Sequence, residues 1–177
     1  MDRKSAARYV VALFTLAACG SLPVSNVQYS AGYAPGEVVP RNAVPTLVMG
    51  NPFSTPQPEF AAAVVDAMQG NTSDPATFVA SNNSSGVYRV IMLFGSGTFT
   101  GQALCAQPPQ AQGISGTGAS ASLPLAAVLC RGDSSLAYAH GTVDGSGGPS
   151  SPAFRRGVGQ FTRLLFPVQN PERCVNC

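Results

Sequence analysis

Cysteine is the residue type whose spacing offers the most chemistry in this chain. The five cysteines are Cys19, Cys105, Cys130, Cys174 and Cys177. The last two form a Cys-Val-Asn-Cys pattern, a spacing found in thiol-disulfide redox motifs and in half of a tetrahedral zinc site. A redox motif uses a helix N-terminus to lower the pKa of one thiol, and the given sequence has no residues after Cys177 to form that helix. Zinc would need two further ligands, and the only histidine is His140.

We therefore expect the cysteines that follow Cys19 to form disulfides. Their number is even, as in exported proteins, and four cysteines allow three pairings. Cys105 and Cys130 each lie in an apolar segment that we predict to be a strand, and a long loop separates them, so we favour this pair. Cys174 and Cys177 would form the second bond. Redox work by that C-terminal pair is the alternative.

The remaining candidates for catalysis are weak. His140 alternates with Tyr138 in LAYAHGTV, and Asp133 or Asp144 could orient it as a general base, but a lone histidine on a strand is usually a structural or surface residue. No serine lies in a Gly-x-Ser-x-Gly elbow. GSGTFTG has one residue too many for a dinucleotide fingerprint, and no P-loop lysine is present. We predict no catalytic, cofactor-binding or metal-binding residues, and hence no enzyme.

The N-terminus carries the most specific motif. MDRKSAAR is basic, the apolar run that follows it has ten residues, and Leu16-Ala17-Ala18-Cys19 closes it. An apolar run of this length is too short to span a bilayer, which needs about 20 residues. Its order of basic, apolar and small residues is that of a secretory signal. The last four residues resemble the lipobox of bacterial lipoproteins, in which a lipid is attached to the cysteine and the leader is removed just before it.

This resemblance implies a leader over residues 1–18 and a lipidated Cys19 that anchors the protein in the bacterial envelope. Two or three acyl chains, of the palmitate kind, make such an anchor practically permanent, because each buried methylene contributes about 0.8 kcal/mol. Gly20 follows the cysteine where the best-known inner-membrane retention rule requires Asp. The resemblance thus favours an outer-membrane lipoprotein that faces the periplasm.

The charge balance argues against a nucleic-acid partner. Residues 1–18 hold three of the ten Lys and Arg residues and one of the eight Asp and Glu residues, so the remainder is formally neutral. No basic tract with interleaved aromatic residues remains after the leader. The partners that we expect are the membrane, through the lipid, and an envelope protein.

Glycine and proline divide the mature chain. Residues 19–44 are rich in Gly, Pro, Ser and Asn without a sustained period, so we expect a lipidated flexible tether. Residues 45–177 form the single domain that a chain of this length can supply. The tether, if flexible, would have an r.m.s. reach of roughly 25 to 30 Å.

Within the domain, hydrophobic periodicity predicts strands and two helices. The strands are expected at 46–49, 87–95 and 99–106, and in two apolar segments on either side of a turn at Arg-Gly-Asp-Ser, 131–134. One helix would be capped by Thr55 and end before Gly70. The second would open at Ser151 and Pro152 and end before Pro167.

This order predicts an α+β fold, a two-layer sandwich in which a mainly antiparallel sheet of four to five strands carries two helices on one face. We expect a non-enzymatic interaction or assembly module of the envelope. The alternative is an envelope thiol-disulfide or ligand-binding protein that uses the C-terminal Cys-x-x-Cys. The architecture resembles that of small envelope lipoproteins, a likeness that says little about function.

Overall fold

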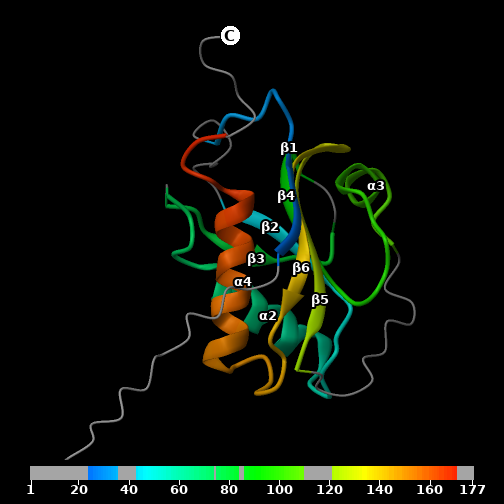
Figure 1. Cartoon of the computed structure of the whole chain (residues 1–177), viewed down its shortest axis with the longest axis vertical. Coiled ribbons are helices and arrows are strands. Elements are labelled where there is room, and N and C mark those ends of the chain that lie inside the picture. Colours follow the sequence, from blue (N-terminus) through cyan, green and yellow to red (C-terminus); the bar gives the residue numbers. More distant parts are fainter. Residues whose placement is uncertain (1–23, 36–42, 74, 84–85, 110–120, 171–177) are drawn as a thin grey trace, which may run out of the picture.

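A computed structural model of the chain describes residues 24–35, 43–73, 75–83, 86–109 and 121–170 (Figure 1). In chain order the described elements are β1 (Val24–Tyr29), β2 (Val44–Met49), α2 (Gln57–Met68), β3 (Phe78–Ala80), β4 (Tyr88–Phe94), α3 (Gly101–Ala106), β5 (Leu123–Arg131), β6 (Ser134–Val143) and α4 (Pro152–Leu165).

The described strands form one mixed sheet in the order β1-β6-β5-β4-β2-β3. β1, β6, β5 and β4 pair antiparallel, whereas β2 is parallel to both β4 and β3. The α+β class and the mainly antiparallel sheet are therefore confirmed. The sheet has six strands because short β3 and β1 join its two edges.

Two helices cover one face of the sheet, as predicted. In Figure 1, α4 and α3 lie on opposite sides of the strands. The buried residues of α2 pack into the same core as those of α4, whereas those of α3 pack into a separate one. The larger core lies between the sheet and the two long helices, and its centre holds the rings of Phe60, Phe94 and Phe154, with centroids 5.0 to 6.1 Å apart. Such aromatic contacts stabilise the packing beyond the area that they bury.

The periodicity that predicts α4 matches its buried side. Phe154, Val158, Phe161 and Leu165 are fully buried. The Ser151 side chain accepts a hydrogen bond from the backbone N–H of Phe154, as expected for an N-cap. Ser151 thus caps the start of this helix as predicted, and the four apolar residues form its buried side.

Glycine in α4 permits close packing. A Cβ at Gly157 would lie 3.0 Å from the Val143 side chain of β6, and one at Gly159 would lie 2.8 Å from the Asn71 side chain. Glycine costs about 1 kcal/mol of helix propensity relative to Ala. Here its small size lets α4 approach β6 and the chain after α2.

Residues 24–35 correct the predicted tether. β1 lies within the segment 19–44 and pairs with β6 from Val24 opposite Gly141 to Tyr29 opposite Ala137. Tyr33 is fully buried, and its hydroxyl donates a 2.7 Å hydrogen bond to the carbonyl of Leu165. The composition of this segment is typical of a linker, but pairing with β6 satisfies its backbone groups and makes it part of the domain.

Residues 99–106 correct a second prediction. This segment is not the hairpin partner of β4, because β4 pairs with β5 and residues 101–106 form α3. In a short apolar run, the hydrophobic period alone does not distinguish a strand from a buried helical turn. The Thr100 side chain accepts from the N–H of Ala103 and starts the helix.

Two smaller predictions have opposite outcomes. The turn between β5 and β6 is confirmed, with Gly132 at a φ of 55°. Thr55 is not the cap of α2: the N-cap position is Pro56, without a side-chain hydrogen bond, and Thr55 Oγ1 is buried without a hydrogen-bond partner.

Candidate functional site: the α3 face of the sheet

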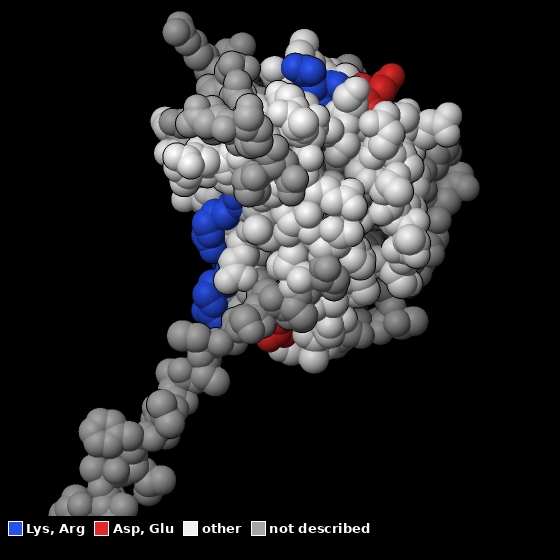
Figure 2. All heavy atoms as spheres, turned by 45° about the horizontal axis from the view of Figure 1, so that its top comes forward, with Lys and Arg blue, Asp and Glu red and all other residues white. Residues whose placement is uncertain are grey.

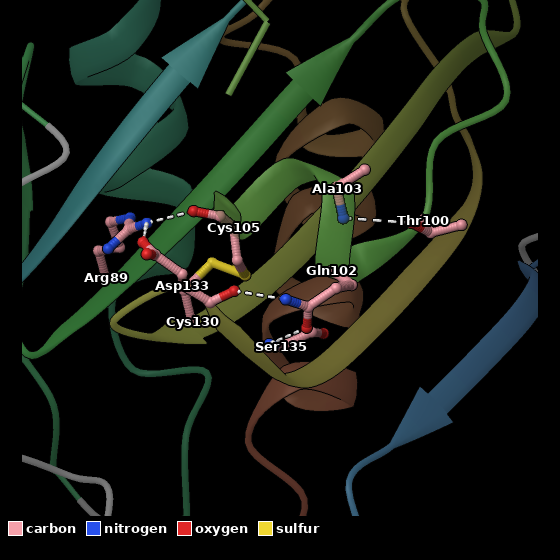
Figure 3. Close-up of a disulfide and its surroundings, with 8 residues drawn as sticks. All are labelled: Arg89, Thr100, Gln102, Ala103, Cys105, Cys130, Asp133 and Ser135. Carbon is pink, nitrogen blue, oxygen red and sulfur yellow. Dashed lines mark hydrogen bonds and ion pairs between the residues drawn. A yellow bond between two sulfur atoms is a disulfide. The ribbon is translucent and has the colours of Figure 1, made fainter. Parts of the chain in front are cut away.

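The disulfide between Cys105 of α3 and Cys130 of β5 lies at the α3 face, and it is the pair that the sequence favoured (Figure 3). Both cysteines have no exposed surface. A buried bond of this kind is out of reach of external thiols and serves to fix the structure. Cys174, Cys177 and Cys19 lie outside the described residues.

Hydrogen bonds hold the rest of α3 against β6. Gln102 Nε2 donates to the carbonyl of Asp133 over 2.9 Å, and Tyr138 Oη donates to the carbonyl of Phe99 over 2.7 Å (Figure 3 shows the first). Gly101 packs so closely that a Cβ there would lie 2.4 Å from Ser135 Oγ. The helix is therefore held at its start, middle and end.

Arg89 is a buried cation at the C-terminus of α3, and the sequence analysis missed it. It lies opposite Cys130 in the β4–β5 ladder and is 5% exposed. Arg89 Nη2 donates to the carbonyl of Cys105 over 2.5 Å and lies 3.8 Å from Asp133 Oδ1, as Figure 3 shows. A cation is favoured at a helix C-terminus. The signal in the sequence was an arginine within the apolar run VYRVIMLF.

The described part of Arg89's surroundings leaves one donor unused. Its Nε is buried without a hydrogen-bond partner. The guanidinium is otherwise occupied by the carbonyl of Cys105 and the exposed carboxylate of Asp133. This arrangement supports a structural role for Arg89 in joining β4, α3 and the β5–β6 turn.

A groove opens beside α3. Its volume is about 260 Å³, and its lining consists of Asn26, Gln28, Gly97, Thr98, Phe99, Thr100, Tyr138 and His140. The two amides come from β1, which we had expected to be tether. Amides, hydroxyls and one imidazole can donate and accept hydrogen bonds to a small polar group, and the Phe99 ring offers an apolar surface beside them.

The groove does not assemble the acid-base pair that the sequence raised. Asp133 lies at the far end of β6 from His140, roughly 24 Å away at about 3.4 Å per residue. Asp144 accepts hydrogen bonds from the side chain and backbone N–H of Ser146, which together with Arg156 lower the pKa of its carboxyl. Neither aspartate lines the groove with His140. The described residues also contain no group of three His, Cys, Asp or Glu side chains that could hold a metal ion.

The arginines of α4 are spread out and partly occupied. Arg155 Nη1 lies 2.5 Å from Asp66 Oδ2 of α2, and Arg163 donates to the side chain of Asn71. Figure 2 shows the Lys and Arg side chains of the visible face in separate groups. Arg155 and Arg163 therefore join α4 to α2 and to the residues that follow it, from exposed positions.

Burial changes the acidity of three tyrosines. Desolvation raises the pKa of Tyr29, Tyr33 and Tyr138 above the ordinary value, and the nearby Tyr29 adds to the effect on Tyr33. Tyr29 and Tyr33 hydroxyls donate to the carbonyls of Leu164 and Leu165 at the end of α4. These groups fasten β1 and the chain after it to the domain.

Comparisons with known proteins give no family. No protein-family profile matches the chain, and no curated protein matches it. Among solved structures, the fold is similar to a PelC variant dodecamer from Paraburkholderia phytofirmans, with a TM-score of 0.41 and 14% identity over 82% of this chain and 99% of that one. The likeness is too distant to extend that protein's assembly to this chain. None of the described helices is long and apolar enough to cross a membrane.

Proposed function

We propose that the protein is a lipid-anchored envelope protein, attached through Cys19 to the outer membrane and facing the periplasm, whose domain is a non-enzymatic interaction or assembly module. The observation that carries the proposal is the Leu16-Ala17-Ala18-Cys19 motif behind a basic and apolar leader. The mature protein would start at Cys19.

The site geometry supports this proposal in two ways. The buried Cys105–Cys130 bond is of the type that persists in an oxidising compartment such as the periplasm. Among the described residues, Arg89, Gln102 and Tyr138 use polar groups to hold α3 or the residues before it, and neither Asp133 nor Asp144 lines the groove with His140. The disulfide fits an exported protein, and the use of these polar groups in holding α3 favours a binding module over an enzyme.

The anchor is tested by replacing the lipidated residue. Cys19→Ala should abolish labelling by an alkyne analogue of palmitate and leave the leader uncleaved, as judged by the mass of the purified chain. Gly20→Ala is the matched control, because it leaves the cysteine in place and should be labelled. A Cys19→Ala protein that is still labelled and shortened would refute the proposal.

The Cys-x-x-Cys pattern at Cys174 and Cys177 supports a second candidate, a thiol-disulfide protein. A thiol titration of the native chain against glutathione buffers separates the two. Fully oxidised cysteines with no reducible fraction near the glutathione poise would remove the redox candidate. Crosslinking in intact cells, with wild type compared to Cys19→Ala, would then identify the envelope partner.

A further inference from the structure

The start of β1 sets how far the domain can stand from the lipid. β1 begins at Val24, only five residues after Cys19. A fully extended chain spans at most about 3.6 Å per residue, so the Cα of Val24 lies within roughly 18 Å of the Cα of Cys19. A 25-residue tether would have allowed several times that distance.

β1 is fixed within the domain, so this limit applies to the whole domain. It pairs with β6 along its length, the Tyr29 hydroxyl donates to Leu164 at the end of α4, and Asn170 Nδ2 donates to the carbonyls of Ser30 and Tyr33. Peeling β1 away would break these bonds and expose buried Tyr33. Only the residues between Cys19 and Val24 can therefore change the distance between the lipid and the domain.

From these observations we infer that the domain lies directly on the bilayer surface, with the start of β1 and the neighbouring end of β6 facing the lipid headgroups. The inference rests on the proposed lipidation of Cys19. The anchored side is defined here as Val24 to Asn26 of β1, His140 to Val143 of β6 and the loop 144–151 that follows β6. Its partner is a lipid headgroup surface.

The chemistry of the anchored side fits contact with headgroups without insertion. The loop 144–151, Asp-Gly-Ser-Gly-Gly-Pro-Ser-Ser, is small and polar, with one charged residue. The exposed large hydrophobic residues of the described chain are Val79, Val87 and Val168. All three lie toward the opposite end, where β3 and β4 begin and the chain leaves α4.

The strand registers give the distance between the two ends. Val24 pairs with Gly141, whereas Val87 precedes Tyr88, which lies level with Arg131 at the turn into β6. Seven residues of β6 separate these levels, roughly 24 Å, and three strand spacings add roughly 14 Å sideways. The end that carries Val87 therefore points away from the membrane.

Tryptophan reporters can measure this orientation because the chain has no tryptophan. Asn26→Trp places a reporter on an exposed position of the anchored side, and Val87→Trp, at a position 69% exposed, places one at the far end. Each lipidated full-length protein would be reconstituted into phosphatidylethanolamine and phosphatidylglycerol vesicles that contain a dansyl-headgroup lipid. Energy transfer to dansyl, which falls steeply with distance, should be several-fold more efficient from Asn26→Trp than from Val87→Trp.

An added linker provides the decisive second variant. About 15 Gly and Ser residues inserted between Gly20 and Ser21 lengthen the link from five to about 20 residues, which raises its r.m.s. reach from roughly 12 Å to roughly 25 Å and leaves the domain unchanged. Transfer from Asn26→Trp should then fall several-fold. Equal transfer from both reporters, stronger transfer from Val87→Trp, or no effect of the linker would overturn the inference.

Failure of the anchor itself has a different signature. The acyl mass of the purified chain and its flotation with plain vesicles test lipidation without reference to orientation. A chain that is acylated and floats but gives the wrong pattern of transfer overturns the orientation alone. A chain that carries no acyl mass overturns the anchoring, and the orientation with it.

Discussion

The Cys105–Cys130 bond provides a prediction whose size follows from the chain. The two cysteines are 25 residues apart in sequence. In the chain-entropy model, a closed loop of this length removes about 12 cal/mol/K from the unfolded chain, or about 3.5 kcal/mol at 25 °C. The double variant Cys105→Ala, Cys130→Ala should lose this amount from the free energy of unfolding.

The assay is urea unfolding followed by far-ultraviolet circular dichroism, since the chain lacks tryptophan. With a slope of about 2 kcal/mol/M, the midpoint should fall by roughly 1.7 M. Wild type in a strong reductant should approach the same midpoint. Removal of the two buried sulfur atoms leaves small cavities, which would add to the loss in the double variant only.

The matched control is Cys174→Ala, Cys177→Ala, which leaves the bond to α3 intact and should keep the wild-type midpoint within roughly 0.8 M, because a three-residue loop removes only about 1.6 kcal/mol in the same model. If the urea midpoint of Cys105→Ala, Cys130→Ala decreases by less than about 0.5 M, the reasoning is refuted. Such a decrease corresponds to only about 1 kcal/mol, which is far below the loop-closure value.

Three further predictions follow from packing and acidity. Gly157→Ala should destabilise the domain by about 1 to 2 kcal/mol despite the gain in helix propensity, because the new methyl would lie 3.0 Å from Val143; Val143→Ala in the same chain should recover part of the loss in urea melts. Ser146→Ala should raise the pKa of Asp144, because it removes the hydrogen bond that the Ser146 hydroxyl donates to the carboxylate; a carboxyl-carbon NMR titration would detect the change. The stability that comes from the lowered pKa is present above the pKa of the unfolded chain and is lost as the pH falls through the pKa of the folded one. Tyr33 should remain protonated above pH 10 until the domain unfolds, because burial raises the pKa of its phenol. The free energy of unfolding should therefore fall as the pH rises past the pKa of tyrosine in the unfolded chain. Ultraviolet titration of Tyr33→Phe, which lacks that phenol, provides the comparison.

Much of the fold was predictable where one local pattern dominates. β4 was read from the apolar run VYRVIMLF, α4 from apolar residues at helical spacing behind Ser151 and Pro152, and the β5–β6 turn from Gly132 beside Asp133. In these segments propensity, capping and hydrophobic pattern agree with one another. The lipobox is likewise a matter of sequence, and its consequences remain a prediction.

Pairing between distant segments decided the rest. Residues 24–29 have the composition of a linker and become a strand because β6 offers a free edge. Residues 101–106 become a helix because the bond to Cys130 and the close contact of Gly101 with Ser135 fit a helical turn over the sheet. The contact of Arg89 with the C-terminus of α3 depends on the pairing of β4 with β5, which no local pattern in the sequence reveals.

The sequence by itself therefore determined the α+β class, the two long helices, the favoured disulfide and the expected anchor at Cys19, since each depends on a local pattern or a short motif. The tertiary structure alone decided that β1 belongs to the sheet of the domain, because strand pairing is a property of two segments more than 100 residues apart. Under the proposed lipidation of Cys19, the position of β1 places the domain only five residues from the lipid and limits how far it can lie from the membrane.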